Sequence, residues 1–241
     1  MKIVGVAIAI AILTLTLLWQ PRWALRLAAW AKPGALYFVP TEQQRVALTI
    51  DDGPHPQTTD QILAVLAQHD AQATFFIIRD HLASNEAALS KMVTAGHELG
   101  NHMTADAPSI RLSAAEFEAD LLAAEAALID YAKPRWLRPG MGWYSAEMVD
   151  IAAKHGYRLA LGSVFPYDTH IPSAQFAAWF ILTKVQPGDV IVLHDGSRDR
   201  GQRTVEVLQQ ILPALEQRGY AVVGVEEMVR GARTEESGSK D

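Results

Sequence analysis

The chain has 241 residues, 49% of them hydrophobic, with a formal net charge of −6 and no cysteine. This length is enough for one domain with a substantial core, and the scattered Lys and Arg residues argue against nucleic-acid binding. Without cysteine, neither a disulfide framework nor a thiolate metal site can form. Any metal ion would therefore be held by His, Asp, Glu and water.

An uncharged apolar run extends from Ile3 to Trp19 at the start of the chain. A helix of about 20 residues crosses a hydrocarbon core about 30 Å thick, so this run is just long enough to span a membrane. It is longer than the apolar part of a typical signal peptide. We therefore favour a retained transmembrane anchor in residues 1–20 over a cleaved signal or a buried soluble helix. Residues 21–40 are predicted to be a juxtamembrane linker, partly helical.

Strand-like and helix-like segments alternate from residue 41 onward. Strands are predicted at 46–50, 74–78, 98–101, 159–163, 190–194 and 221–225, and helices at 59–68, 85–95, 113–131, 146–155 and 204–217. Ser113 and Glu116 form a capping-box pattern. Repeated βα units with polar motifs at strand ends predict a parallel α/β barrel with its site on the C-terminal rim. We place this domain at residues 41–230 and expect a disordered tail at 231–241.

The most informative segment is VALTIDDGP, from Val46 to Pro54, where an apolar strand ends in two adjacent carboxylates. Side chains alternate along a strand, so Asp51 and Asp52 are expected to point in different directions. They would then have different roles, such as general base and metal ligand. Three later segments supply further polar residues: GHELGNHMTADAP, LRPGMGW and IVLHDG.

In this order, the four segments resemble the motifs of the NodB-type polysaccharide deacetylases, which are carbohydrate esterases of family four. The resemblance covers residues 46–225 and implies a distorted (β/α) barrel. It also implies metal-dependent removal of N-acetyl groups from an acetylated amino-sugar glycan, such as chitin oligomers, peptidoglycan or an exopolysaccharide. An extracytoplasmic catalytic domain is expected by the same analogy. The sequence does not distinguish this reaction from hydrolysis of O-acetyl esters.

The resemblance also assigns roles to single residues. Asp51 would be the general base, held ionised by Arg138, and His194 the acid that protonates the leaving amine. Asp168 lies in the segment LGSVFPYDT, Leu161 to Thr169, which resembles a further family motif with two carboxylates, and it matches the one that would support the arginine. The backbone N–H of Met141 matches a donor to the oxyanion of the tetrahedral intermediate.

Asp52 and His102 match the family's first two metal ligands, and Asp106 stands where a third ligand, usually histidine, is expected. The spacing of four residues would place His102 and Asp106 on one face of a helical turn that ends at Pro108. A second carboxylate lowers the charge of the bound ion and favours harder metals than zinc, so zinc, cobalt, manganese and nickel all stay open. The alternative is that Asp106 is a surface residue and that the metal is lost.

Two more positions depart from the family pattern. Met141 stands where a tyrosine is usual, and Phe165 stands where a second carboxylate is usual. Stacking against a sugar ring would then depend on Trp143, Tyr144, Phe165 or Tyr167. These departures favour an alternative reading, a catalytically weak or inactive glycan-binding relative. Against it stand the retained residues Asp51, Asp52, His102, Arg138 and His194.

Overall fold

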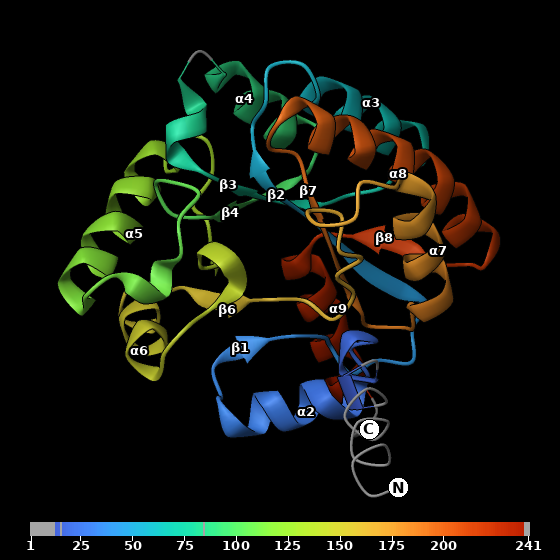
Figure 1. The fold of residues 1–241 in the computed structure, drawn as a ribbon, viewed down its shortest axis with the longest axis horizontal. Helices are drawn as coiled ribbons and strands as arrows, with labels where there is room; N and C mark the ends of the chain where they lie inside the picture. Colours follow the sequence, from blue (N-terminus) through green and yellow to red (C-terminus); the bar gives the residue numbers. More distant parts are fainter. Residues whose placement is uncertain (1–12, 15, 84, 239–241) are drawn as a thin grey trace, which may run out of the picture.

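Short runs rich in β-branched and aromatic residues form a sheet at the centre of the molecule (Figure 1). The computed structural model describes residues 13, 14, 16–83 and 85–238. Seven parallel strands follow one another across the sheet in the order β1 (Ala35–Leu36), β6 (Arg158–Ala160), β5 (Trp136–Leu137), β4 (Glu98–Asn101), β3 (Thr74–Ile77), β2 (Arg45–Gly53) and β7 (Val190–His194). An eighth, β8 (Ala221–Val223), pairs with the first part of β2.

The sheet curls without closing into a full barrel. Among the described residues no strand pair joins β1 to β7, although a single bridge between Val164 and Ile191 brings the chain after β6 back to β7. The predicted parallel α/β fold is therefore confirmed, and its barrel is an incomplete, curled one.

Helices connect the strands and surround the sheet (Figure 1). They are α2 (Arg22–Ala31), α3 (Thr59–Gln68), α4 (Glu86–Thr94), α5 (Ala114–Leu128), α6 (Ala146–Lys154), α7 (Ala174–Lys184), α8 (Arg198–Gln217) and α9 (Val225–Gly238). The predicted capping box begins α5: the backbone N–H of Ser113 donates to the Glu116 carboxylate at 2.8 Å, and the Ser113 hydroxyl accepts from the Glu116 N–H. Both bonds satisfy N–H groups that the first helical turn leaves free.

The core lies on both faces of β2. Leu48 and Ile50 are fully buried in the larger hydrophobic cluster, together with residues of α3, α7 and α8, whereas Ala47 belongs to a second cluster with Phe76. A parallel strand covered on both faces reads as a continuous apolar run, as VALTI does. This burial fixes the end of β2, and with it the two aspartates that follow.

The structure differs from the predicted domain bounds at both ends, and one helix was missed. Part of the expected linker forms α2 and β1, and β1 pairs with β6, so the domain begins before residue 41. The expected disordered tail continues α9 as far as Gly238, because this helix packs against the second cluster through Met228 and Val229. Helix α7 was missed because AQFAAWFILTK is apolar on nearly all sides and shows no helical stripe. Residues 239–241 of the tail lie outside the described part.

Most of the predicted membrane-spanning run, residues 3–19, lies outside the described residues. Residues 13, 14 and 16–18 of it are helical. Within the part of the chain that the structure describes, no helix combines the length and the apolar character needed to cross a bilayer.

One buried histidine makes stability depend on pH. His97 lies behind β3, where its Nδ1 accepts a hydrogen bond from the Ala73 N–H at 3.3 Å, and burial lowers the pKa of His97 to about 4. Between pH 6.5 and 4, His97 is protonated in the unfolded chain but stays neutral in the folded chain. The free energy of unfolding therefore falls as pH drops from 6.5 toward 4. We expect His97→Gln to flatten this part of the curve in urea unfolding measured at each pH. An unchanged slope would contradict the assignment.

Candidate active site

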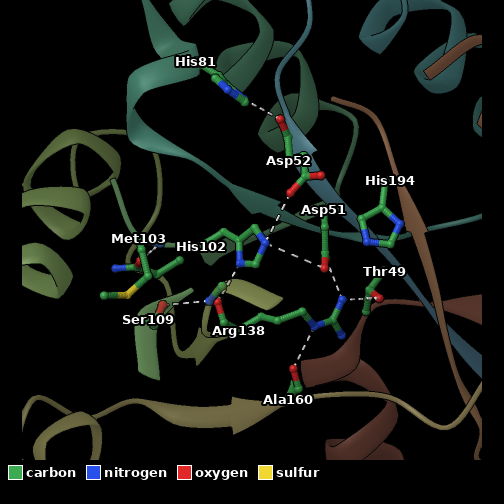
Figure 2. A network of polar contacts seen from close by, with 12 residues as sticks. Thr49, Asp51, Asp52, His81, His102, Met103, Ser109, Arg138, Ala160 and His194 are labelled. Carbon is green, nitrogen blue, oxygen red and sulfur yellow. Dashed lines mark hydrogen bonds and ion pairs between the residues drawn. The ribbon is translucent and has the colours of Figure 1, made fainter. Parts of the chain in front are cut away.

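The polar residues of the four sequence motifs lie together at the carboxyl ends of neighbouring strands (Figure 2). Asp51 of β2 lies in register with His194 of β7, and Asn101 of β4 lies in register with Leu137 of β5. His102 and Arg138 therefore follow strand ends that are side by side. A cavity of about 430 Å³ is lined by all of the predicted base, acid and metal residues: Asp51, Asp52, His102, Asp106, Arg138 and His194.

Both aspartates face this cavity, contrary to the prediction from simple alternation. Asp52 has a left-handed backbone, with φ of 67°, and the pairing of β2 with β3 shifts register between Asp51 and Gly53. This irregularity turns the Asp52 side chain back toward the side that Asp51 faces. As a result, Nε2 of His102 lies 3.3 Å from Oδ1 of Asp52 and 3.9 Å from Oδ2 of Asp51.

Asp51 is held by Arg138 in a buried ion pair. Nη1 of Arg138 lies 2.5 Å from Oδ1 of Asp51, and both residues are 3% exposed. The guanidinium also donates to Thr49 Oγ1 and to the Ala160 carbonyl, each at 2.8 Å (Figure 2). It lies over the Phe76 ring as well. These contacts fix the direction of the guanidinium and keep a positive charge beside the Asp51 carboxylate.

One atom of this guanidinium stays without a partner. Nη2 of Arg138 is buried and has no hydrogen-bond acceptor among the described residues. A buried N–H donor without an acceptor is uncommon in folded proteins.

His102 directs one ring nitrogen at Asp52. Its Nδ1 donates to the Arg138 carbonyl at 2.6 Å, which leaves Nε2 directed at the two carboxylates. Burial alone would lower the pKa of His102, but the hydrogen bond that the Asp52 carboxylate accepts from it and the charges of both aspartates raise it. When the imidazole is neutral, Nε2 and Asp52 Oδ1 are both acceptors. A cation between them, either a proton or a metal ion, stabilises the arrangement, so these two side chains fit a divalent ion.

Asp106, the third predicted metal ligand, does not form a three-ligand group with Asp52 and His102. Asp106 is exposed and lines the cavity, but the described residues contain no group of three His, Asp or Glu side chains placed to hold a metal ion. The helical turn predicted from His102 to Asp106 is absent: Met103 has a φ of 68°, and the next helical turn begins only at Ser109. The positive φ breaks the turn, so the i to i+4 spacing does not set the direction of Asp106.

Asp168 supports the histidine rather than the arginine. Its Oδ2 lies 2.9 Å from Nδ1 of His194, whereas the partners of Arg138 are those named above. Burial alone would lower the pKa of His194, but the charge and hydrogen bond of Asp168, with the charges of Asp51 and Asp52, raise it. Arg203 in turn donates to the Asp168 carbonyl at 2.7 Å. His194 is thereby oriented with Nε2 free for the cavity.

Met141 lies at the tip of a tight turn on the rim. It has a φ of 60°, its side chain is 58% exposed, and the N–H of Gly142 closes the turn on the Pro139 carbonyl at 2.9 Å. Of the aromatic candidates for sugar stacking, Phe165 lines the cavity, Trp143 is exposed on the rim and Tyr144 is buried. Tyr167 lines a neighbouring apolar cavity and donates to the Leu18 carbonyl at 2.5 Å.

Sequence reasoning missed several residues that hold this site. Arg200 of α8 forms an ion pair with Oδ2 of Asp52, opposite His102, and His81 Nδ1 donates to the Asp52 carbonyl at 2.6 Å. Burial would raise the pKa of Asp52, but the hydrogen bond and charge of His102, with the charges of His194 and Arg200, lower it. Arg200 was missed because the start of α8 was predicted too late. The helix begins at residue 198, six residues before the predicted start, so Arg200 is a helical residue and not a loop residue.

Asp195 faces away from the cavity, as alternation predicted. It is fully buried, and its two carboxylate oxygens accept hydrogen bonds from the hydroxyls of Thr58 and Thr59 at the start of α3. Burial raises the pKa of Asp195. This residue joins the end of β7 to α3 and takes no part in the cavity.

A family model and curated sequences both identify proteins that are similar to this chain. The family model for polysaccharide deacetylase matches residues 38–160. A peptidoglycan-N-acetylglucosamine deacetylase of Bacillus cereus is 34% identical over 80% of this chain and 91% of its own length. A chitooligosaccharide deacetylase of Bradyrhizobium is 33% identical over 73% of this chain and 87% of its own.

Solved structures share the fold. A crystal structure of a peptidoglycan N-acetylglucosamine deacetylase matches with a TM-score of 0.78 at 26% identity, over 82% of this chain and 93% of that one. A pseudoenzyme of carbohydrate esterase family four from Bacillus anthracis matches with a TM-score of 0.75 at 26% identity, over 82% and 69% of the two chains. On the family model and these relatives, the chain belongs to the polysaccharide deacetylase family of hydrolases.

Proposed function

We propose that this protein removes N-acetyl groups from an acetylated amino-sugar glycan outside the cytoplasmic membrane, with peptidoglycan or a chitin-like oligomer as the substrate class. One observation carries the proposal. Asp51 and His194 lie in register at the ends of two paired strands and line one cavity, Asp51 held by Arg138 and His194 held by Asp168. A base and an acid facing the same space are the minimum for cleaving an amide, whose nitrogen leaves poorly unless it is protonated.

In this mechanism each side chain has one task. Asp51 takes a proton from the attacking water, and Arg138 holds its carboxylate in position. The backbone N–H of Met141 donates to the oxyanion that develops from the acetyl carbonyl. His194, whose pKa is raised beside Asp168, then gives its proton to the sugar nitrogen as acetate leaves.

Asp52 and His102 would hold a divalent metal ion. Such an ion supplies Lewis acidity toward the acetyl carbonyl and lowers the pKa of a nearby water. Arg200, on the second oxygen of Asp52, fixes the first oxygen toward His102. The identity of the ion, among zinc, cobalt, manganese and nickel, is part of the test below.

The test is acetate release from an N-acetylglucosamine oligomer by the full chain in detergent, stripped of metal and resupplied with each ion in turn. A domain cut at Thr41 is unsuitable because it lacks β1. We expect release to return with at least one ion, and Asp106→Ala to weaken binding of that ion, measured by calorimetry. Asp80→Ala is the matched control, since Asp80 is also an exposed carboxylate beside the cavities but pairs with Arg79. Weaker metal binding in both variants would argue against a specific role of Asp106.

A second candidate function is glycan binding with weak or no turnover. The observation that favours it is the exposed Asp106, which leaves the described residues without a three-ligand group. This candidate predicts that the oligomer binds without acetate release under any metal. It also predicts that the unmutated chain retains no metal after dialysis. An O-acetylated substrate assayed in parallel separates ester from amide hydrolysis.

The ion pair between Asp168 and His194 predicts a pH effect. Because the pKa of His194 is raised in the folded chain, the acid form persists to higher pH than for a free histidine. We expect Asp168→Asn to lower kcat and to move the alkaline limb of the pH–rate profile toward lower pH. The pair stabilises the fold fully below the ordinary pKa of 6.5, and this contribution is lost as pH rises through the folded pKa. The stability lost in Asp168→Asn is therefore larger at pH 6 than at pH 9. If Asp168→Asn left the alkaline limb of the pH–rate profile unchanged, His194 would not be the acid.

A further inference from the structure

Helix α2 turns its apolar side away from the molecule. Trp23, Leu27 and Trp30 recur with helical spacing on one face and are 51%, 57% and 83% exposed. A helix on the surface of a water-soluble domain normally buries such a stripe. In Figure 1, α2 lies at the edge of the molecule, below β1. The outward stripe therefore has no partner within the described chain.

Polar contacts hold α2 in this orientation. Arg22 at its start forms an ion pair with Asp189 at 3.0 Å and donates to the Pro187 carbonyl at 2.5 Å. Just beyond its end, the Lys32 carbonyl accepts a hydrogen bond from the Tyr144 hydroxyl at 2.6 Å. These bonds join both ends of α2 to the domain, so the apolar face is presented as a fixed surface and not by a loose segment.

A second apolar surface lies where the described chain begins. The Trp19 ring packs edge-on against Phe180 and Trp179 of α7, with ring centroids 5.3 and 6.1 Å apart. Trp179 is 53% exposed, and Leu17 and Leu18 are about half exposed. The cavity here, about 600 Å³, is lined by Leu18, Trp19, Phe165, Tyr167, His170, Ile171, Phe176, Trp179 and Phe180. Pro21 alone separates Gln20, next to this surface, from the start of α2.

The adjoining sequence identifies the occupant of these surfaces. The uncharged run from Ile3 leads directly into Leu17, Leu18 and Trp19. The first 41 residues contain four Lys or Arg and no Asp or Glu, in a chain whose net charge is −6. Tryptophan prefers the membrane–water interface, and basic helices with a Trp and Leu face lie flat in that zone on anionic lipids. An apolar run beside a segment without acidic residues fits an anionic lipid surface, and the test below separates this occupant from a second copy.

We propose that α2 and the Trp19–Trp179 surface rest on an anionic lipid bilayer, with Trp23, Leu27 and Trp30 inserted at the level of the headgroups. The apolar cavity shares Phe165 and His170 with the catalytic cavity. The bilayer would therefore lie beside the mouth of the catalytic cavity, and the domain would work at a fixed height above the lipid.

The absence of cysteine from the sequence allows a direct test on the full chain. Ala31→Cys places a single thiol on the exposed side of α2, and Ala87→Cys places one on exposed α4, at the opposite end of the molecule in Figure 1. Each is labelled with an environment-sensitive fluorophore and reconstituted into vesicles of phosphatidylglycerol and phosphatidylcholine, or of phosphatidylcholine alone. Quencher-bearing lipids report contact with the bilayer.

We expect emission at position 31 to shift to shorter wavelength and to be quenched by lipid, more strongly in the anionic vesicles, while position 87 does neither. Adding Trp23→Gln, Leu27→Gln and Trp30→Gln to the Ala31→Cys chain should abolish the shift without loss of fold, since all three side chains are exposed. Equal spectra at positions 31 and 87 in vesicles would overturn the proposal. So would a shift at position 31 that grows with protein concentration in the absence of lipid, which would indicate a second copy on this face.

Discussion

Arg138→Met should lower the free energy of unfolding by roughly 3–5 kcal/mol, the range found when one partner of a buried ion pair is removed. The reason is that Asp51, 3% exposed, would keep its charge in the interior without the guanidinium 2.5 Å away. The hydrogen bonds to Thr49 and Ala160 and the contact with the Phe76 ring are lost at the same time. Urea unfolding at neutral pH, with chelator present, measures the change.

A double-mutant cycle separates the ion pair from these other contacts. Asp51→Asn removes the anion and leaves Arg138 its bonds to Thr49 and Ala160, so its effect on stability should be smaller. The chain with both substitutions should lose less stability than the sum of the two single losses, because no unpaired charge stays buried. Strict additivity would show that Asp51 and Arg138 do not stabilise each other.

Asp51→Asn should reduce the rate of acetate release by roughly 10²- to 10⁴-fold, the usual contribution of a positioned general base. The amide has the shape of the carboxylate but cannot take a proton from water. Binding of the oligomer should change little, since the loss falls on kcat. Steady-state kinetics with the metal that restores activity provide the measurement.

Two controls accompany this variant. Asp51→Asn should retain its metal affinity in calorimetry, because Asp52 and His102 are unchanged. Asp80→Asn, which alters an exposed carboxylate, should leave the rate of acetate release unchanged. If Asp51→Asn kept more than a tenth of the unmutated rate, another group would have to be the base. Asp52 would then be the first to examine, since it faces the same cavity.

Local sequence patterns predicted regular structure well. The bounds of α3, β4 and β7 agree with the predicted ranges. In α3 the apolar residues recur with helical spacing, and β7 is a short continuous apolar run that ends at His194. The capping box at Ser113 was also correct, since both of its hydrogen bonds form within one turn. Helix α7 escaped notice because its burial on several sides comes from tertiary packing.

The site was predicted by residue identity but not by geometry. Alternation failed at Asp52 and helical spacing failed after His102 for the same reason, a non-glycine residue with positive φ. Such backbone states are held by the surrounding fold and carry no local sequence pattern. The partner of Asp168 was also misjudged, because contacts between a loop and a strand end depend on where the loop is folded. Arg200 could be found only once the true start of α8 was known.

The left-handed backbone at Asp52 has a consequence for how such a site changes over time. Glycine, asparagine and aspartate adopt this conformation more readily than most residues, so a glutamate introduced at position 52 would carry a backbone penalty as well as a change of ligand. Position 106 has no positive φ and is exposed. In the proposed metal site, residue 106 could therefore be exchanged without a backbone penalty, whereas residue 52 is constrained by its backbone conformation.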